Sequence, residues 1–295
     1  MIAPRRFLPS ISSLLALEAV DRLGSATAAA EDLALTHSAI SRQIKTLEEQ
    51  IGVSLFYRRG KSLQLTPAGA VYARSVRECL SDLARASLKV KASGSRPSLN
   101  LAVLPAFGMS WLGPRLKPFL AAHPTILINQ ATRIKPFDFD LEDFDAAIHF
   151  GTEQWVGVDY LPLLRERVIA VCAPDMAPDL PLTPEQMLQQ PLLHLESRPG
   201  AWEEWFAAHG IEANKLRGML FDQFINISEA AVGGLGYALL PEFLAEGEFQ
   251  RGRLVPASAD YLDVEGTYYL VWAKHRPIPE PLQRLIDWLR EDVAP

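Results

Sequence analysis

Residues 36–66 read THSAISRQIKTLEEQIGVSLFYRRGKSLQLT. The first half of this stretch has apolar residues at helical spacing, and Gly52 ends the pattern, so it predicts a helix that begins after Thr36. These apolar residues are Ile40, Ile44, Leu47 and Ile51. The second half has a basic turn at 58–61, followed by a short strand in which Leu63 and Leu65 alternate with polar residues. A helix, a basic turn and a strand in this order are typical of a winged helix-turn-helix domain.

Two further helices are predicted upstream of Thr36. Apolar residues between Leu8 and Val20 follow the period of a helix until Gly24 stops the pattern, and Ser25 then caps a short alanine-rich helix. The outer face of the 37–51 helix carries short hydroxyl and basic side chains, which suit the base edges and phosphates of a major groove. An ordinary three-helix bundle with a polar face is the alternative interpretation. The DNA-binding candidates are Thr36, His37, Ser38, Ser41, Arg42 and Lys45 on the helix and Arg58, Arg59 and Lys61 in the basic turn.

The stretch from Ser38 to Phe56, together with LTPAG at 65–69, resembles the LysR-type transcriptional regulators, and among them the glycine-cleavage-activator-like subgroup. The resemblance implies an α/β protein with an N-terminal winged helix-turn-helix, a long dimerising linker helix and a two-lobed effector domain of periplasmic-binding-protein type. One position departs from the family, which often has Gln where this chain has His37. Gln reads adenine with two hydrogen bonds whereas His offers a single donor or acceptor, so the operator preference at that base is not carried over.

The segment after the strand predicts a long helix. Thr66 can cap it, Pro67 suits its first position, and no later proline interrupts the chain before Lys91. Small and apolar residues along it step by three and four, as in the seam of a two-stranded coiled coil, which predicts a homodimer. A single helix packed on its own domain is the alternative. The seam residues are Ala73, Val76, Leu80, Leu83, Ser87 and Val90. Cys79 lies beside this seam and is expected to be a small buried residue.

Beyond Ser98 the apolar runs alternate between strand and helix patterns, which predicts an α/β sheet. Strands are expected at 99–104, 126–132 and 146–149 and a helix at 109–123. Two further runs, at 167–172 and 267–272, are the strands that the resemblance implies cross between two lobes. The predicted domains are the winged helix-turn-helix at 1–66, the linker helix at 67–91, a hinge at 92–97 and the effector domain at 98–295, with lobe I at 98–165 and 271–295 and lobe II at 166–270.

Two α/β lobes joined by crossover strands form a cleft at the carboxyl ends of the strands, where a small ligand would bind. A helix N-terminus near 108–110 could receive an anion, with Arg133 as a counter-charge or else paired with Asp138 or Asp140 outside the cleft. In the resembled family the position of Ala106 commonly carries a hydroxyl that holds the effector, and its absence here favours a more apolar ligand. The effector-binding candidates are Ala106, Phe107, Gly108, Thr132, Arg133, His149, Phe150, Trp202, Phe224 and Asn226.

No residue pattern in the chain predicts catalysis or a cofactor. The six histidines and two cysteines never occur at metal-ligand spacing, and no nucleophile motif is present. Gly233, Gly234 and Gly236 follow a predicted helix and precede a predicted strand, which is the reverse of a nucleotide-binding loop. We therefore expect no enzyme activity, no metal and no cofactor. An enzyme in the same cleft is kept as a weaker hypothesis, and so is a solute-binding protein of transport, which would need export.

The distribution of charge agrees with a DNA-binding N-terminus. Residues 1–95 hold 13 Lys and Arg against 8 Asp and Glu, whereas residues 96–295 hold 16 against 27. A basic end on an acidic body suits a polyanionic partner at that end only. Glu18 and Asp21 interrupt the apolar stretch that imitates a secretion signal, and no apolar run is long enough for a membrane span. We expect a cytoplasmic regulator, with double-stranded promoter DNA and a small-molecule effector as partners. The resemblance implies a homotetramer and adds RNA polymerase as a further partner.

Overall fold

The computed structural model describes residues 4, 7–59, 62–94, 96–176 and 181–292. The chain divides into two compact units, Met1–Gly94 and Ser95–Pro295, here called unit 1 and unit 2. Each unit has its own buried core, as expected of an independent domain. Among the described residues, no helix is both long and apolar enough to cross a membrane.

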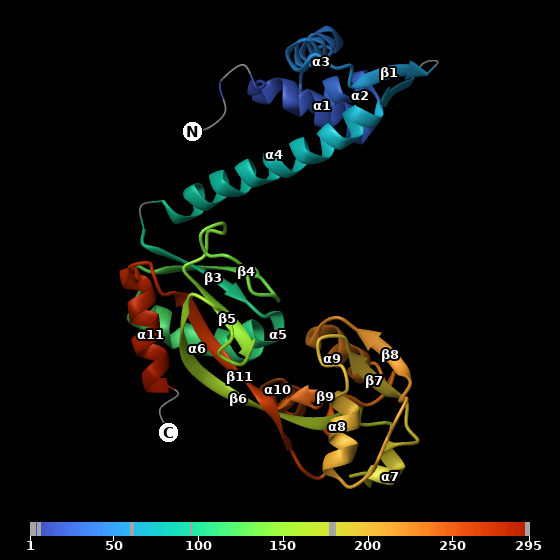
Figure 1. The fold of residues 1–295 in the computed structure, drawn as a ribbon, viewed down its shortest axis with the longest axis vertical. Helices are drawn as coiled ribbons and strands as arrows, with labels where there is room; N and C mark the ends of the chain where they lie inside the picture. Colours follow the sequence, from blue (N-terminus) through green and yellow to red (C-terminus); the bar gives the residue numbers. More distant parts are fainter. Residues whose placement is uncertain (1–3, 5–6, 60–61, 95, 177–180, 293–295) are drawn as a thin grey trace. The chain divides into compact units, whose positions relative to one another are not determined.

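Unit 1 has the predicted winged helix-turn-helix fold (Figure 1). It comprises α1 (Ile11–Leu23), α2 (Ala26–Asp32), α3 (His37–Ile51), the antiparallel hairpin of β1 (Phe56–Arg59) and β2 (Ser62–Leu65), and α4 (Pro67–Ser93). Side-chain hydroxyl groups cap the N-termini of α1 to α4. Each accepts a hydrogen bond from a backbone N–H of the first turn, and the four residues in chain order are Ser10, Ser25, Thr36 and Thr66. Gly24 and Gly52 end α1 and α3 in the left-handed conformation, which glycine adopts without steric cost.

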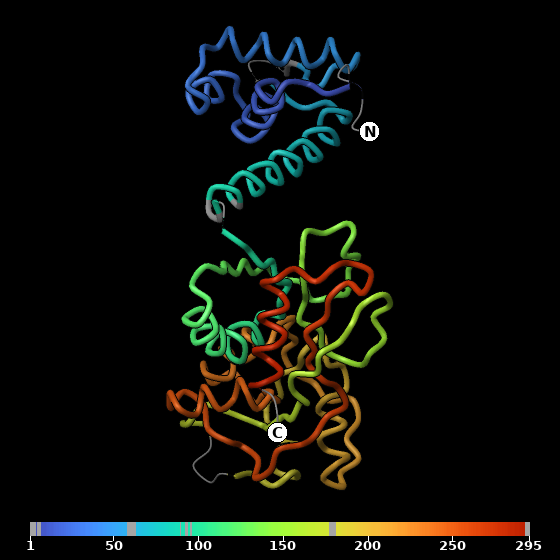
Figure 2. Tube along the Cα trace, turned by 90° about the vertical axis from the view of Figure 1, so that its left-hand side faces the viewer, coloured from blue at the N-terminus to red at the C-terminus, as the bar shows by residue number. Residues whose placement is uncertain are grey.

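Helix α4 is continuous (Figure 2), but its predicted seam is divided between two environments. Ala73 and Val76 are 1% and 4% exposed because they pack in the core of unit 1 against residues of α1 and α3. Leu83 and Val90 are 48% and 72% exposed. The near part of the seam therefore packs on its own domain, as in the alternative interpretation, and the far part is uncovered. The expectation for Cys79 is wrong, since this residue is exposed.

Unit 2 confirms the α/β interpretation of the C-terminal part. Its elements in chain order are β3 (Ser98–Val103), α5 (Pro105–Phe107), the π-helical turn η2 (Gly108–Leu112), α6 (Gly113–Ala122), β4 (Leu127–Thr132), β5 (Ala146–Gly151), β6 (Val158–Cys172), α7 (Pro184–Met187), β7 (Leu192–Leu195), α8 (Ala201–Ala208), β8 (Gly218–Phe221), α9 (Phe224–Val232), β9 (Ala238–Pro241), α10 (Glu242–Gln250), β10 (Val255–Pro256), β11 (Leu262–Ala273) and α11 (Glu280–Asp292).

Two long strands connect the two lobes of unit 2. Within the described residues, seven strands form one sheet in the order β10-β6-β11-β5-β3-β4, with β9 also paired to β6, and β7 and β8 form a second, parallel pair. The runs predicted at 167–172 and 267–272 are the halves of β6 and β11, which extend from one lobe into the other (Figure 1). We call β3, β4, β5, α5, α6 and α11 lobe I, and the elements from α7 to β10 lobe II.

The first helix of lobe I begins earlier than the sequence predicted. The helix expected at 109–123 starts at Pro105 and continues through the π-helical turn into α6. Pro105 suits the first helical position, and the backbone N–H of Gly108 already donates to the carbonyl of Leu104 at 2.8 Å. Gly108 is needed for packing rather than for ending a helix, because a Cβ there would lie 3.2 Å from Cγ2 of Val103. The anion site predicted at a helix N-terminus near 108–110 is therefore wrong.

Candidate functional site

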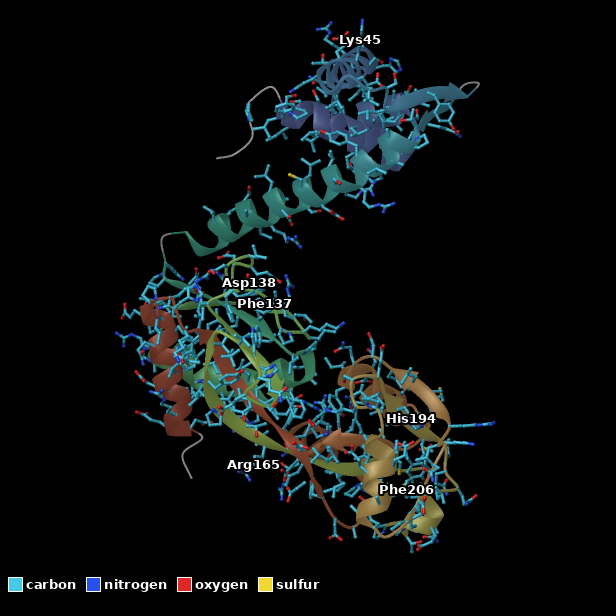
Figure 3. The ribbon with its side chains drawn as sticks, in the orientation of Figure 1. Lys45, Phe137, Asp138, Arg165, His194 and Phe206 are labelled. Atoms are coloured by element: carbon cyan, nitrogen blue, oxygen red, sulfur yellow. The ribbon has the colours of Figure 1, made fainter. Side chains whose placement is uncertain are left out.

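The outer face of α3 is the polar surface that the sequence predicted. The six helix candidates, Thr36, His37, Ser38, Ser41, Arg42 and Lys45, are all exposed, while Ile40, Ile44 and Leu47 on the opposite face are buried. Lys45 points outward from α3 (Figure 3) and lies 3.7 Å from Glu49. Thr36 has a structural task as well, because its hydroxyl accepts the N–H of Ala39 at 3.2 Å and so begins the helix.

The presentation of α3 depends on contacts with α1 and on a tight turn after α2. The hydroxyl of Ser13 in α1 donates to the side-chain oxygen of Gln43 at 2.7 Å. Ala34 takes a positive φ of 52°, and the next N–H, of Leu35, bonds back to the carbonyl of Ala30 at 2.8 Å. A non-glycine residue in this conformation is uncommon, and here it makes the short connection that turns the chain from α2 into α3.

The hairpin of β1 and β2 lies where the sequence predicted the wing. Phe56 pairs with Leu65 and Arg59 with Ser62, so the described part of the hairpin ends at the pair of Arg59 and Ser62. Arg58 and Arg59 belong to β1, but their side chains and the whole of Lys61 lie outside the described residues. The hydroxyl of Tyr57 donates to the side-chain oxygen of Gln64 at 2.9 Å and joins the two strands on one face.

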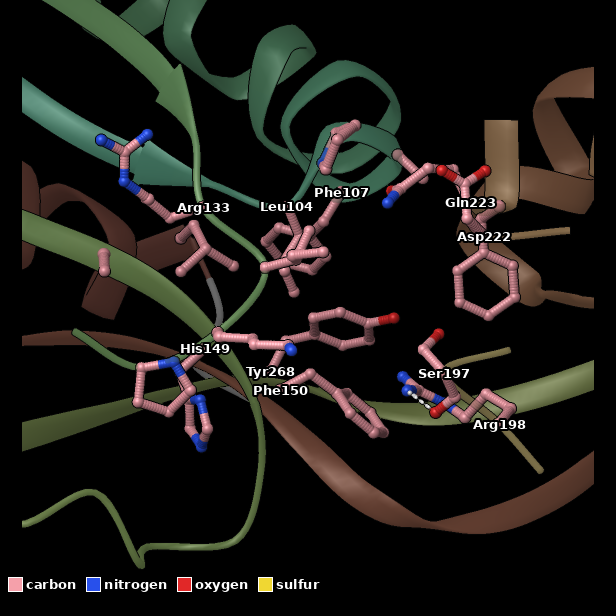
Figure 4. A pocket seen from close by; sticks show the side chains of 18 of the residues that line it. Leu104, Phe107, Arg133, His149, Phe150, Ser197, Arg198, Asp222, Gln223 and Tyr268 are labelled. Atoms are coloured by element: carbon pink, nitrogen blue, oxygen red, sulfur yellow. Dashed lines mark hydrogen bonds between the residues drawn. The ribbon is translucent and has the colours of Figure 1, made fainter. Parts of the chain in front are cut away.

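Unit 2 contains a cavity of about 580 Å³ between its lobes (Figure 4). The walls come from the carboxyl ends of β3, β4 and β5 in lobe I and of β7 and β8 in lobe II, together with Tyr268 of β11. This is the place where α/β sheets bind ligands, since loops from neighbouring parallel strands converge there. Its volume lies within the usual range for small-molecule sites.

Aromatic rings line the middle of this cavity. Phe107 stacks on Tyr268 at 4.4 Å between centroids and on Trp111 at 4.7 Å. Phe150 contacts Tyr268 at 4.7 Å and lies beneath the guanidinium of Arg198, whose Cζ is 3.9 Å from the ring centroid. Phe107 and Tyr268 are almost fully buried, so they form the floor of the cavity as part of the core.

A buried hydrogen-bonded group holds Arg198 at the edge of the cavity. Its Nε lies 3.3 Å from Oε1 of Glu166, a residue of β6 that is 2% exposed. The other oxygen of Glu166 accepts the hydroxyl of Tyr268 at 2.6 Å. Burial, and then the negative charge of Glu166, raise the pKa of Tyr268, so its hydroxyl keeps its proton and donates. The three side chains connect lobe II with both crossover strands.

Arg133 and His149, which the sequence placed in lobe I, have partners of their own. Arg133 pairs with Glu142 at 2.6 Å rather than with Asp138 or Asp140, and Asp140 is bound by Arg276 and His275. The Nε2 atom of His149 lies 3.3 Å from the carbonyl of Thr152. Burial lowers the pKa of His149, which favours the neutral imidazole at neutral pH. Among the described residues, no group of three or more His, Cys, Asp or Glu side chains is arranged to hold a metal.

Two family profiles match the chain, one for each unit. The profile described as "Bacterial regulatory helix-turn-helix protein, lysR family" matches residues 11–70, and that described as "LysR substrate binding domain" matches residues 92–294. The second match alone covers more than half of the chain. The chain belongs to the LysR family of bacterial regulators. It has the helix-turn-helix DNA-binding domain and the effector-binding domain of a LysR-type transcriptional regulator.

Curated relatives cover nearly the whole of this LysR-type chain. The glycine cleavage system transcriptional activator of Escherichia coli is 35% identical over 267 residues, which span 90% of this chain and 87% of that protein. The regulator TrpI of Pseudomonas aeruginosa is 33% identical over 294 residues, spanning 98% of this chain and 99% of that protein.

Solved structures of LysR-type regulators have the same fold. The effector domain of AmpR from Pseudomonas aeruginosa is 31% identical, with a TM-score of 0.61 over 68% of this chain and 96% of that one. Full-length CbnR in complex with its target DNA gives a TM-score of 0.66 over 95% of this chain and 98% of that one. At 18% identity, the likeness to CbnR shows the fold alone.

The structure brings six of the ten effector-binding candidates of this LysR-type chain together in the cavity walls. They are Ala106, Phe107, Arg133, His149, Phe150 and Phe224. The other four lie elsewhere. Gly108 is buried inside the first helix, and Thr132 is exposed at the end of β4. Trp202 is a core residue whose Nε1–H donates to the carbonyl of Leu193 at 2.8 Å, and Asn226 is exposed and donates its amide to Asp222 at 2.9 Å.

Sequence reasoning missed most of the charged lining of the cavity. The omitted charged residues are Lys135, Glu196, Arg198 and Asp222, and Ser197 and Tyr268 were omitted as well. Glu196 and Asp222 directly follow β7 and β8, which have only four residues each and give too short an apolar pattern to be identified. Identifying β7 and β8 as a parallel pair would have placed both residues at strand ends, in the way that Arg133 was placed after β4.

Proposed function

We propose that this LysR-type regulator reads promoter DNA with the exposed face of α3 and contacts the backbone with the basic turn of the hairpin. The exposed polar face of α3 carries the proposal, because the six candidate residues are exposed while Ile40, Ile44 and Leu47 of the same helix are buried. Arg42 has a guanidinium suited to guanine or to phosphate, and Lys45 suits phosphate. Arg58, Arg59 and Lys61 add three positive charges at the turn.

The proposed organisation follows the boundaries predicted from the sequence, with 1–66 binding DNA, 67–91 linking, 92–97 as hinge, and 98–165 with 271–295 and 166–270 as the two lobes. Two chains pair through the uncovered part of α4, where Leu83 and Val90 offer apolar surface. Two such dimers join through their effector domains into a homotetramer.

In this proposal, ligand binding in the cavity changes the angle between the lobes, and that change reaches DNA through the linker helices. The regulator acts in the cytoplasm, has no catalytic step of its own and changes the access or activity of RNA polymerase at the promoter. Support comes from the position of the cavity, whose walls are shared between both lobes and a crossover strand.

Fluorescence anisotropy of the full chain on DNA from upstream of its own gene, against a scrambled duplex, tests the DNA-binding assignment. The upstream fragment should retain its preference when salt is raised from about 50 to about 200 mM. Arg42→Ala should weaken specific binding by about 1–3 kcal/mol. Arg165→Ala removes the same kind of side chain from an exposed position in unit 2 and serves as the matched control. Equal binding by Arg42→Ala and the unaltered protein would refute the assignment.

A further inference from the structure

We propose that the cavity of unit 2 takes a zwitterion, a small molecule whose carboxylate faces Lys135, whose ammonium faces Asp222 and Glu196, and whose apolar or aromatic body lies between them. The inference rests on the proposed role of this cavity as the effector site and adds the chemical class of the effector. It is carried by the distribution of charge around the walls of the cavity.

The lobe I side of the cavity has an uncompensated positive charge. Lys135 lines the wall, is exposed and has no ion pair within the described residues. The second cation on that side, Arg133, is already neutralised by Glu142 at 2.6 Å. His149 contributes no charge of its own at neutral pH. A ligand that enters here therefore meets one free ammonium group, which attracts an anion.

The lobe II side has two uncompensated negative charges. Leu195 and Phe221 are the last paired residues of β7 and β8, and the backbone N–H of Glu196 donates to the carbonyl of Phe221 at 2.8 Å. The carboxylates of Glu196 and Asp222 therefore come from adjacent strand ends. In the part of the chain that the structure describes, Asp222 accepts only the neutral amide of Asn226, and the side chain of Glu196 has no ion pair.

Arg198 does not neutralise these carboxylates, although it lines the same wall. Its Nε is directed at the buried Glu166, and its Nη1 donates to the carbonyl of Ser197 at 3.1 Å. The net charge of the pair formed by Arg198 and Glu166 is zero, so the lobe II side keeps the two negative charges of Glu196 and Asp222. Figure 4 shows Asp222 and Gln223 on one side of the ring of Tyr268 and Arg133 and His149 on the other.

The region between the two charged sides is apolar. Phe107, Phe150 and Tyr268 form its floor, and Leu104 and Ala106 add aliphatic surface. A ligand with an anionic group alone would place its far end against uncompensated carboxylates, and a ligand with a cationic group alone would meet Lys135. Only a molecule with both charges satisfies both sides. The expectation of a more apolar ligand came from Ala106 alone, and the charged lining changes it.

The test uses one dipeptide in three charge states, measured by titration calorimetry on the full-length protein. L-alanyl-L-phenylalanine carries both charges, its N-acetyl derivative only the carboxylate, and its C-terminal amide only the ammonium. We expect the dipeptide to bind at least about tenfold more tightly than either derivative. Lys135→Glu should weaken the binding of the dipeptide and of the N-acetyl form but not the binding of the amide. Asp222→Asn should weaken the binding of the dipeptide and of the amide but not the binding of the N-acetyl form.

Two exposed residues outside the cavity give matched controls. Lys274→Glu and Asp260→Asn make the same changes of charge and should leave all three affinities unchanged. The zwitterion assignment is overturned if the N-acetyl form or the amide binds as tightly as the dipeptide, or if none of the three binds at about 10 mM. Anisotropy on promoter DNA separates this failure from that of the proposed function. If the protein still binds promoter DNA specifically but does not bind the dipeptide, only the zwitterion assignment is overturned. If specific DNA binding is absent, the proposed regulatory function is overturned.

Discussion

Replacing Phe107 with alanine should destabilise unit 2 strongly while leaving unit 1 intact. The ring is 1% exposed and contacts Trp111, Phe243 and Tyr268 at 4.4–5.4 Å between centroids. Truncating a buried Phe to Ala costs about 3–5 kcal/mol in all, with the lost contacts included. Three aromatic partners place Phe107 toward the upper end of this range, so we expect a loss of about 4–5 kcal/mol. Such a loss is comparable with the whole stability of many domains. Phe107→Leu, which keeps most of the volume, should cost only about 1–2 kcal/mol.

Urea unfolding followed by tryptophan fluorescence measures this change in unit 2 alone, because all six tryptophans lie between residues 111 and 288. With a slope of about 2 kcal/mol per molar urea, the midpoint should fall by about 2 M in Phe107→Ala. Leu141→Ala is the control, since Leu141 is 84% exposed and should change stability by less than about 0.5 kcal/mol. If Phe107→Ala shifted the midpoint no more than Leu141→Ala does, the ring would be free in the cavity and its assignment to the floor would be wrong.

Three further perturbations probe other parts of the chain. Gly69→Ala should destabilise unit 1 by about 1–3 kcal/mol, because the new Cβ would lie 2.1 Å from the carbonyl oxygen of Leu55. The unfolding transition of unit 1 measured by circular dichroism should shift, while the transition measured by tryptophan fluorescence should not. An unchanged dichroism transition would contradict this prediction. Burial holds the pKa of His149 below its ordinary value of about 6.5, so the unfolded chain takes up this proton first as pH falls. The urea midpoint should therefore drop as the pH falls through about 6.5, and less so in His149→Gln, while parallel curves would be the opposing result. Burial raises the pKa of Cys172 to about 11, whereas Cys79 is exposed. Iodoacetamide at about pH 8 should therefore label only Cys79 in the native protein and both cysteines in urea, as measured by mass spectrometry. Rapid labelling of Cys172 in the native protein would contradict this prediction.

The helices of unit 1 could be predicted from the sequence because their signals are local. Ser25, Thr36 and Thr66 cap helices within three residues of the groups they bind, and Gly52 ends α3 where the apolar period stops. What the seam residues of α4 pack against, by contrast, depends on residues that are distant in the sequence. Whether Ala73 and Val76 meet a partner chain or the core of unit 1 depends on Leu17, which lies more than fifty residues away in the sequence. Helical spacing gives a face its apolar character and leaves open what covers that face.

The cavity was harder to predict for the same reason. Strand ends in lobe I were found because β3, β4 and β5 have six residues each, long enough for a recognisable apolar run. The first helix was predicted to begin near 108–110, whereas it begins at Pro105, and Gly108 lies inside it, packed closely on Val103. Tyr268 lies within a predicted strand, but its position over the cavity follows from the register of β11, which shifts between Asp263 and Thr267. A single sequence does not contain that shift in any short pattern.

The side chains that hold Arg198 also join the wall of the cavity to both crossover strands of unit 2. Arg198 has five N–H donors, and among the described residues its Nε is directed at Glu166 and its Nη1 at the carbonyl of Ser197. A ligand that pulls the guanidinium of Arg198 toward the cavity would have to weaken its ion pair with Glu166. Because Glu166 is buried, leaving its carboxylate without a cation would be energetically costly. Because Glu166 lies on β6 and also accepts from Tyr268 on β11, such a pull acts on both crossover strands at once. Arg198, Glu166 and Tyr268 therefore form one set of direct contacts that joins lobe II to both crossover strands.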